Sequence, residues 1–452
     1  MTSDAESKPV EPKPVGAYRA RESRRFRMDM RPLRSSANYR RLYFGGTISF
    51  IGTMVTYVTI PFQVKQLTGS FVAVGLVGLL QLGPMILCGL WGGAIADAFD
   101  KRRVVLICLT AELFLAIIMM ANSVLASPKL WVVYVVAMLF SGFDALQRPS
   151  AQAIVPRVVA HDQLPAAAAL SSLQMTVGSI LGPAIGGMIL AGFGTGWAYA
   201  VDALSYAIAL AFFVRLSNIP ASSSGENPSM RGIAEGLKYA WKRKDLLGTY
   251  VIDLAAMMLA FPFALFPFVA DELGAPWALG WLYAAGSVGG LIAALSSGWL
   301  ARVHHHGRGV AIAAVFWGVA IGVFGLATNI WWALVMLAIA GAADMISVMF
   351  RSTIWNQTIP DELRGRLAGI ELLSFTTGPQ LGQIRGGLLA QATSLRFSIA
   401  SGGFSSAVFA SVVALFLPSL WRYDARTNPH AMHQRELRAA EAAALAEPTG
   451  GS

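Results

Sequence analysis

Twelve long apolar stretches, separated by short polar segments, follow one another along this chain. A helix needs roughly 20 apolar residues to cross a bilayer, and these stretches are long enough. They lack the alternating pattern of membrane β-strands, so they predict helices, which satisfy their own backbone groups in lipid. We expect spans at 42–62, 71–97, 103–126, 130–156, 164–193, 197–216, 246–270, 277–301, 309–328, 330–358, 366–391 and 396–421.

Composition indicates the same class of protein. Apolar residues make up 55% of the chain and charged residues only 13%, whereas soluble domains carry about 25% charged residues. The two cysteines both fall inside apolar stretches, so we expect no disulfide framework. His304, His305 and His306 are adjacent in a loop, whereas a metal site needs ligands that converge from different directions, so we expect neither a metal nor a cofactor.

The positive charge is distributed unevenly between the two sides of the membrane. Of the 35 Lys and Arg residues, 29 lie on the side of the two termini and 3 on the opposite side. This bias predicts that both termini are cytoplasmic in a multi-pass protein of the cell (inner) membrane. Because the excess charge lies in tails and loops, we expect no nucleic-acid partner.

The two halves of the sequence resemble each other. The stretch "VGLVGLLQLGPMILCGLWGGAIAD" (74–97) aligns with "LGWLYAAGSVGGLIAALSSGWLAR" (279–302), and Gly75 then matches Gly280. Pro61 matches Pro267, and "LGPAIGG" (181–187) matches "LGQIRGG" (381–387), so the offset stays near 205 residues. We therefore predict an all-α polytopic membrane protein with two pseudo-symmetric six-helix bundles.

This repeat divides the chain into five segments. They are a basic N-tail (1–41), an N-terminal bundle (42–216), a linker with an amphipathic helix (217–245), a C-terminal bundle (246–421) and a cytoplasmic C-tail (422–452). After about residue 425 we expect the C-tail to be either disordered or loosely associated with the membrane. Two similar bundles that rock about a central site favour a transporter over a duplication kept only for packing. We expect a monomer that contacts the lipid bilayer and handles a small-molecule substrate and protons.

A charged cluster, "GGAIADAFDKRR" (92–103), interrupts the apolar sequence between the second and third spans. A carboxylate that accepts hydrogen bonds from a helix N-terminus in the other half would close the cytoplasmic side. The alternative is that the basic residues only anchor the loop to the membrane surface. The candidate latch residues are Gly93, Asp97, Asp100, Lys101, Arg102, Arg103, Arg364 and Arg366.

Few ionisable residues lie within the predicted spans, and such residues are usually functional. A proton carrier needs a carboxylate that takes up a proton when it is desolvated and releases it when a cation approaches. Asp144 with Arg148, and Asp344 with Arg351, are spaced as intrahelical pairs of this kind, although such pairs could also lock helices together permanently. The other coupling candidates are Glu112, Asp253 and Glu371.

Aromatic and cationic side chains within the spans are candidates for lining a substrate cavity. Aromatic faces suit a catechol or a flat hydrophobic drug, and a buried cation suits an anionic substrate, while most aromatic residues in a bundle serve packing. The candidates are Tyr57, Phe143, Phe261, Phe263, Phe350, Trp355 and Arg385.

The cluster at 92–103 resembles the glycine–aspartate–basic signature of the major facilitator superfamily, in the form of its twelve-helix drug:proton antiporter group. Similar stretches are "RPSAQAIVPRVV", "AVDALSYAIAL", "RGIAEGLKYAWKRKDLLG" and "NQTIPDELRGRLAG", and "GWLYAAGSVGGLIAALSSGWLA" resembles the enterobactin exporter branch, which shares these stretches with macrolide efflux proteins. The resemblance covers about residues 38–421. It implies the major facilitator fold and export of a siderophore or hydrophobic drug, driven by proton entry.

Two other functions are weighed against export. A proton-coupled uptake carrier for a small metabolite is disfavoured by the resemblance. A polytopic membrane enzyme would need a nucleophile with a nearby base, or a metal cluster, at membrane depth, and the sequence indicates neither. We also find no nucleotide-binding loop, so we expect that ATP does not drive the protein directly.

Overall fold

The computed structural model describes residues 29–217, 241 and 243–446, and leaves out the side chains at 90, 94, 96, 97, 301, 361–375 and 441–446. Throughout this part of the chain the secondary structure is helical, without a strand. The helices of the N-terminal half are α1 (Arg31–Ser35), α2 (Ala37–Thr68), α3 (Phe71–Ala98), α4 (Lys101–Ser123), α5 (Leu130–Val158), η1 (His161–Gln163), α6 (Leu164–Gly192) and α7 (Thr195–Phe213).

The C-terminal half repeats this series with more interruptions. Its elements are α9 (Lys244–Ala260), η2 (Phe263–Leu265), α10 (Phe266–Glu272), η3 (Pro276–Ala278), α11 (Leu279–Leu295), η4 (Ser297–Arg302), α12 (His306–Gly325), α13 (Ile330–Thr358), α14 (Asp361–Ala392), α15 (Leu395–Phe416), α16 (Pro418–Trp421) and α17 (Pro429–Ala446). Among the described residues, eleven helical segments are long and apolar enough to cross a membrane. The one predicted span that is not among these eleven is 366–391. It lies in α14, and the side chains in the first half of that helix are not described.

Polar residues placed before apolar runs start several of the spanning helices. The side chains of Ser36, Ser70, Asn329 and Ser394 each accept a hydrogen bond from the backbone N–H three residues later, at 3.1, 3.3, 2.9 and 3.2 Å. A helix N-terminus leaves backbone donors unpaired, and such caps satisfy one of them. The local sequence therefore sets where α2, α3, α13 and α15 begin.

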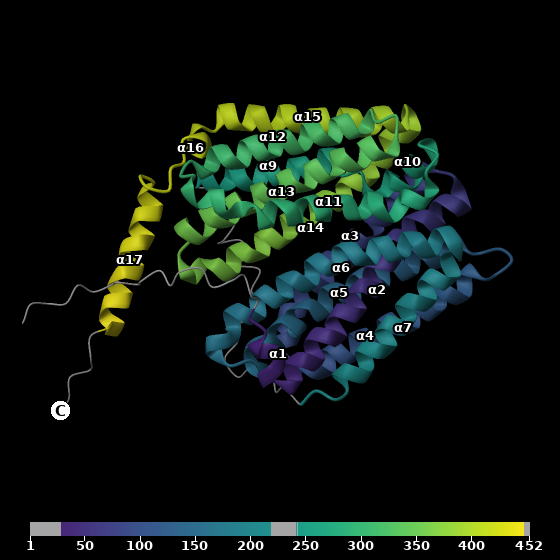
Figure 1. Ribbon diagram of the computed structural model, residues 1–452, viewed down its shortest axis with the longest axis horizontal. Helices are drawn as coiled ribbons and strands as arrows, with labels where there is room; N and C mark the ends of the chain where they lie inside the picture. Colours follow the sequence, from purple (N-terminus) through teal and green to yellow (C-terminus); the bar gives the residue numbers. More distant parts are fainter. Residues whose placement is uncertain (1–28, 218–240, 242, 447–452) are drawn as a thin grey trace, which may run out of the picture.

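The predicted twofold repeat is confirmed by the way in which the helices pack. Gly69, after α2, and Gly274, after α10, are repeat partners, and both have the left-handed φ of 62° that glycine tolerates best. The helix pairs in contact in the first half are α2·α6, α2·α7, α3·α5, α4·α5 and α4·α7, and their repeat partners α9·α14, α9·α15, α11·α13, α12·α13 and α12·α15 are also in contact. Figure 1 shows the two bundles side by side.

The seventh predicted span (246–270) is not one continuous helix. α9 ends at Ala260, Phe261 is extended with ψ 108°, and the chain resumes as η2 and α10 after Pro262. Proline disfavours a helical conformation in the residue before it and lacks the N–H that a continuing helix needs. The eighth span also becomes a 3₁₀ segment, η4, after Leu295. The break in the seventh span places Phe263 at the junction of the two halves, where its ring contacts that of Tyr57 in α2.

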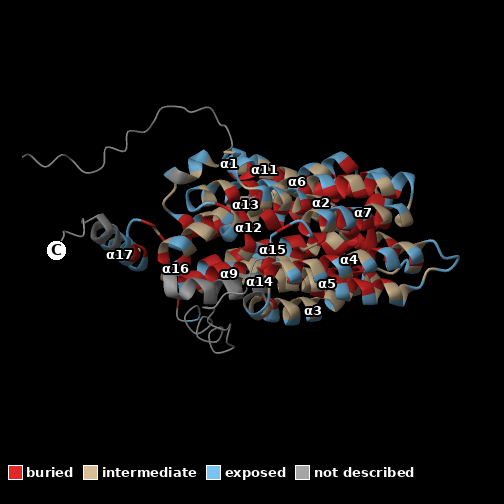
Figure 2. Ribbon diagram, turned by 90° about the horizontal axis from the view of Figure 1, so that it is seen from below, coloured by how far each residue is buried: buried red, intermediate tan, exposed pale blue. Residues whose placement is uncertain are grey.

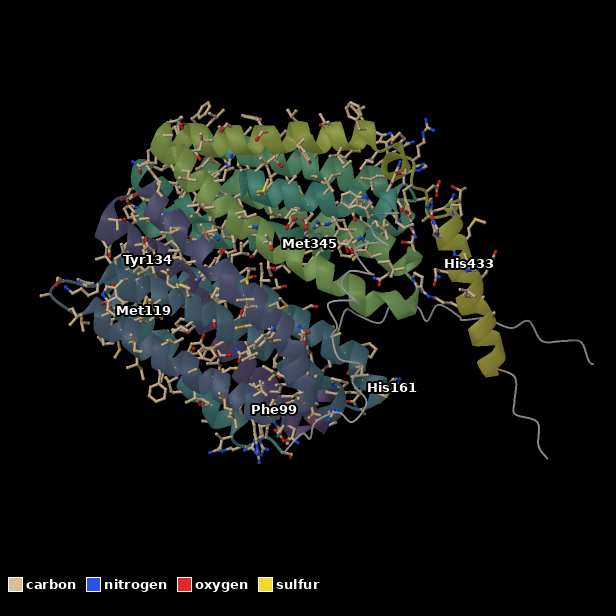
Figure 3. The ribbon with its side chains drawn as sticks, turned by 180° about the vertical axis from the view of Figure 1, so that it is seen from behind. Phe99, Met119, Tyr134, His161, Met345 and His433 are labelled. Carbon is tan, nitrogen blue, oxygen red and sulfur yellow. The ribbon has the colours of Figure 1, made fainter. Side chains whose placement is uncertain are left out.

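Both ends of the described chain lie at the same end of the bundles. We call this the inner end and the opposite one the outer end; Figure 3 shows His161 and His433 toward the former, and Met119 and Tyr134 toward the latter. The expectation of disorder in the C-tail is wrong for Pro429–Ala446, which form the helix α17, whereas loose association of the tail with the membrane stays a prediction. This helix is tied to the C-terminal half by Arg438, which donates to the carbonyl of Asn356 at 3.0 Å. Most of the predicted amphipathic linker helix lies outside the described residues.

Burial follows the helix–helix contacts, and large apolar side chains cover the periphery of the bundles. Figure 2 shows buried residues in red between the helices and exposed residues on the outside. Trp91, Trp131 and Phe316 are 61% to 70% exposed, and many other apolar side chains are also exposed. In a soluble protein such a surface would bind other proteins or aggregate. Around a helical bundle of this length it indicates contact with lipid.

Candidate transport pathway

Glycines close the outer end of the interface between the halves. A Cβ atom at Gly75 of α3 would lie 2.6 Å from the carbonyl oxygen of Gln383 in α14, and one at Gly387 would lie 2.5 Å from the carbonyl oxygen of Phe71. The repeat-related contact joins α6 to α11, where a Cβ at Gly187 would lie 2.4 Å from the backbone nitrogen of Gly280. The glycines conserved between the halves of this sequence therefore allow the helix backbones of opposite halves to touch.

Charged and aromatic side chains reinforce this outer seal. Lys65 at the end of α2 forms an ion pair with Asp271 of α10 and donates to the carbonyl of Pro267 at 2.7 Å. Phe71 contacts Phe268 with their ring centroids 4.3 Å apart. The sequence analysis did not select this group; the available signal was that Lys65 is one of three basic residues on the outer side.

A small pocket lies beneath the seal. Its walls come from α2, α3, η2, α11 and α14, and they include Tyr57, Gln81, Phe263, Tyr283 and Gln383. Its volume is about 20 Å³, which is room for about one water molecule. The predicted cavity residues Tyr57 and Phe263 therefore lie together, 6.3 Å apart between ring centroids. Tyr283, Gln81 and Gln383 were missed, although polar residues within apolar spans were a usable signal.

The N-terminal half contains a polar group of four side chains on two helices. The predicted intrahelical pair is confirmed: the Arg148 guanidinium lies 2.6 Å from the Asp144 carboxylate, and these side chains are 53% and 36% exposed. Gln147, which lies between Asp144 and Arg148 in the sequence, donates hydrogen bonds to both carboxylate oxygens of Glu112 on α4, at 3.0 and 3.1 Å. Glu112 is almost fully buried. α5 thus directs a charged pair to an accessible face and an amide to a buried carboxylate.

The C-terminal half arranges its charges differently from the prediction. Arg351 of α13 forms an ion pair with Asp253 of α9, and both side chains are buried or nearly so. The predicted pairing of Arg351 with Asp344 is not among the described ion pairs. Two turns of helix separate Asp344 from Arg351, whereas α9 runs beside α13 and brings Asp253 directly to the guanidinium. The pair therefore joins two helices.

The remaining predicted cavity residues are scattered. Phe261 stacks on Phe263 at 4.2 Å, close to the small pocket. Phe350 is buried against His306 near the inner end, and Trp355 stacks on Tyr250 of α9 at 4.9 Å. Phe143 packs on the core of the N-terminal half, and Arg385 donates to the carbonyl of Ser398 in α15 at 3.2 Å. These last four contact their own halves.

A buried carboxylate that the sequence analysis did not select lies between α2 and α7. Asp202 is fully buried and accepts a hydrogen bond from the hydroxyl of Thr56. Ser205 donates to Asp202 at 3.3 Å. Its position within a predicted span was the signal that could have identified it.

The structure describes the side chains of only some of the predicted latch residues. Asp100 caps α4 by accepting the N–H of Arg103 at 2.9 Å, Lys101 is buried, and Arg102 donates to the carbonyl of Phe213 at 3.3 Å. These contacts lie within the N-terminal half, where Gly92 lets the backbone of α5 approach closely: a Cβ atom added there would lie 3.2 Å from the carbonyl oxygen of Ala145. The side chains of Asp97, Arg364, Arg366 and Glu371 lie outside the described set, so the latch stays a prediction.

Two six-helix bundles that meet through repeat-related helix pairs define a membrane transporter of the major facilitator superfamily. The family model described as "transmembrane secretion effector" matches residues 28–445, and this chain belongs to that family.

Curated relatives agree over most of the chain. It is 27% identical to the enterobactin exporter EntS of Shigella boydii serotype 18 over 393 residues, which cover 86% of this chain and 94% of the relative. The match to the enterobactin exporter EntS of Escherichia coli O139:H28 has the same identity and coverage. The protein is therefore similar to these exporters over 86% of its own length.

Solved structures with the same fold are more distant in sequence. A mutant of the nucleoside transporter NupG superposes with a TM-score of 0.69 at 15% identity, covering 85% of this chain and 100% of that chain. A bacterial homologue of the iron transporter ferroportin in an inward-facing state superposes with a TM-score of 0.67 at 15% identity, covering 84% and 98%. At such identities the likeness concerns the fold alone.

Proposed function

We propose that this protein exports a catecholate siderophore of the enterobactin type across the inner membrane by proton antiport, with alternating access. The observation that carries the proposal is the similarity to enterobactin exporters over 94% of the relative's length. The chemistry of the candidate pathway supports it. Catecholates are flat, aromatic and anionic, and Tyr57, Phe261 and Phe263 offer aromatic faces while Arg148 offers an accessible cation.

We assign the inner end to the cytoplasm, because the basic residues gather there. The tight outer contacts then correspond to a conformation that faces the cytoplasm and can take up substrate. Protons entering from outside would displace the substrate after the halves rock. Asp144 is the proposed proton carrier, with Arg148 as the cation that returns it to the charged form and Glu112 as a second acidic group nearby.

A secretion assay in cells tests whether the exported substrate is a catecholate siderophore. A bacterial host without its own enterobactin exporter is given this protein or its Asp97→Asn variant, and catecholate in the medium is measured. We expect the wild type to restore secretion and the variant, which lacks the proposed cytoplasmic latch, to restore far less. If the wild type reaches the membrane and secretes no catecholate, enterobactin is excluded, and a panel of hydrophobic drugs in a pump-deficient host tests the alternative substrate class.

Proteoliposomes test proton coupling and direction. With an imposed pH gradient we expect accumulation of substrate against its own gradient by the wild type but not by Asp144→Asn, while counterflow without a pH gradient persists in both. Asp162→Asn is the matched control, because Asp162 is an exposed carboxylate of η1 at the inner end, 3.6 Å from Arg31. Equal pH-driven transport by all three proteins would remove Asp144 from the mechanism. Net movement together with protons would indicate an uptake carrier instead.

A further inference from the structure

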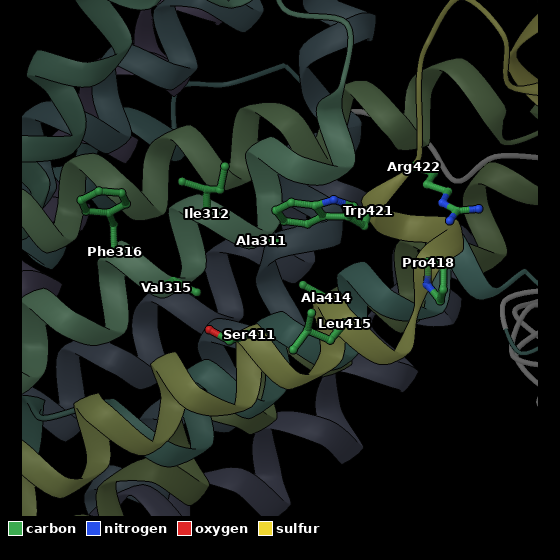
Figure 4. A pocket seen from close by; sticks show the side chains of 10 residues that line it. All are labelled: Ala311, Ile312, Val315, Phe316, Ser411, Ala414, Leu415, Pro418, Trp421 and Arg422. Carbon is green, nitrogen blue, oxygen red and sulfur yellow. The ribbon is translucent and has the colours of Figure 1, made fainter.

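A groove runs along the lipid-facing side of the C-terminal half near its inner end, separate from the interface of the two halves. It lies between α12, α15 and α16, as Figure 4 shows. Its volume is about 580 Å³, within the range of about 300–1,000 Å³ that is usual for ligand pockets. The walls include Ala311, Ile312, Val315, Ser411, Ala414 and Leu415. The groove is therefore large enough for part of a small amphiphile.

The chain path after α15 forms one wall of the groove. Leu417 leaves the helical conformation, and Pro418 then starts α16 in a new direction. The side chain of Leu420 is fully buried and anchors α16 against the bundle. Arg308 of α12 donates to the carbonyl of Trp421 at 3.3 Å, and its guanidinium lies 5.7 Å from the centre of the indole. These contacts hold α16 against α12.

The groove is apolar along its length and positively charged at its inner mouth. Ile312 and Leu415 on its rim are 48% and 76% exposed, so it opens toward the lipid. The one hydroxyl in its walls, on Ser411, is already bonded to the carbonyl of Ala407 at 2.8 Å. Arg422 lines the groove at its mouth, Arg308 lies beside Trp421 there, and both arginines are exposed; none of the described residues that line the groove is a carboxylate. An apolar cleft that ends in two cations and an indole matches a lipid with an anionic head.

We propose that this groove binds one anionic phospholipid from the leaflet at the inner end. An acyl chain occupies the cleft, the phosphate accepts hydrogen bonds from Arg308 and Arg422, and Trp421 lies at the level of the head groups. Basic pockets between helices at the membrane surface bind anionic head groups, and tryptophan prefers this interface. The site is independent of the transported substrate, because it faces the lipid.

Native mass spectrometry of the purified full-length protein tests the site. The protein is titrated with phosphatidylglycerol or with phosphatidylcholine of the same acyl chains, and retained lipids are counted. We expect one phosphatidylglycerol to be retained preferentially. Arg308→Gln/Arg422→Gln should weaken this binding about 30-fold, equivalent to about 2 kcal/mol, because each arginine near anionic head groups contributes about 1 kcal/mol. Ser411→Leu, which fills the cleft and changes no charge, should also abolish preferential retention.

The matched control is Arg34→Gln/Arg215→Gln, which removes two exposed inner-end cations from the N-terminal half. It should bind phosphatidylglycerol as the wild type does. Equal weakening in this control would show that only the overall positive charge matters, and equal retention of the two lipids by the wild type would show non-selective annular lipid; either result overturns the proposal. Unchanged binding by Ser411→Leu would place the lipid outside the groove and overturn it too. Thermal unfolding without added lipid verifies that every variant is folded.

Discussion

Adding one methyl group at Gly75 should shift the protein away from the conformation in which its outer end is closed. The new Cβ would lie 2.6 Å from the carbonyl oxygen of Gln383 and 3.1 Å from the Cα of Ile384, whereas ordinary van der Waals contact begins near 3.4 Å. Both neighbours are backbone atoms of α14, so no side chain can rotate aside. The two halves must separate at this contact, or the seal must accept strain.

The expected magnitude follows from the cost of overpacking, which is about 1–3 kcal/mol for an extra methylene in a tight interior. Because this cost applies only while the outer end is closed, Gly75→Ala should raise the ratio of outer-open to outer-closed protein about 5- to 150-fold. Gly83→Ala is the matched control. Gly83 lies on the same helix, and no atom lies within 4 Å of the position of its added Cβ. The gain in helix propensity, about 1 kcal/mol, is shared by both variants.

Double electron–electron resonance between spin labels at the two outer ends measures this ratio. Gln66→Cys on α2 and Trp277→Cys on η3 supply exposed attachment sites in opposite halves, after Cys88 and Cys108 have been changed to alanine. Gly75→Ala should add a population at longer distance, and Gly83→Ala should not. If the two variants give the same distance distribution while both remain folded, the glycine contact does not control the outer seal and the reasoning fails.

Three further predictions concern buried or sealing contacts. Lys65→Gln should raise the outer-open population up to about fivefold in the same measurement, because a partly exposed ion pair is worth about 0.2–1 kcal/mol; no change would show that the pair is incidental. Asp253→Asn should destabilise the protein by about 3–5 kcal/mol, seen as a lower unfolding temperature, because it leaves Arg351 buried without its partner, and adding Arg351→Gln should recover part of the loss. Thr56→Val should cost about 1–3 kcal/mol by removing the hydroxyl donor from buried Asp202, and an unchanged unfolding temperature would contradict this.

The membrane fold could be predicted from the sequence because its causes are local. Length and apolarity of each stretch determine the spans, and the repeat of glycine and proline positions predicts two equivalent halves. Matches such as Gly75 with Gly280 had a physical reason that the sequence did not reveal: both glycines lie where a helix of one half touches a helix of the other. The break at Pro262 was also signalled by the proline, but an apolar run across it concealed the interruption.

The charged residues were harder to place, because their partners depend on packing between distant segments. Asp144 and Arg148 are four residues apart on one helix, so their pairing could be predicted from spacing. The partner of Arg351 lies on another helix, 98 residues away in sequence. Spacing along one helix favoured Asp344 and could not reveal Asp253. Similarly, Phe350 and Trp355 were grouped with Tyr57 by residue type, whereas the fold directs them into their own half.

The different arrangement of charge in the two halves bears on where proton coupling takes place. A group can couple a proton to a conformational change only if its surroundings differ between the two conformations. Asp253 and Arg351 are buried inside one bundle, so when the halves move as rigid bodies this pair keeps its partner and its environment. Asp144 and Arg148 have accessible side chains, so rocking of the halves changes what faces them. The asymmetry therefore supports a coupling role for the N-terminal pair and a structural role for the C-terminal pair, even though the two halves share one fold.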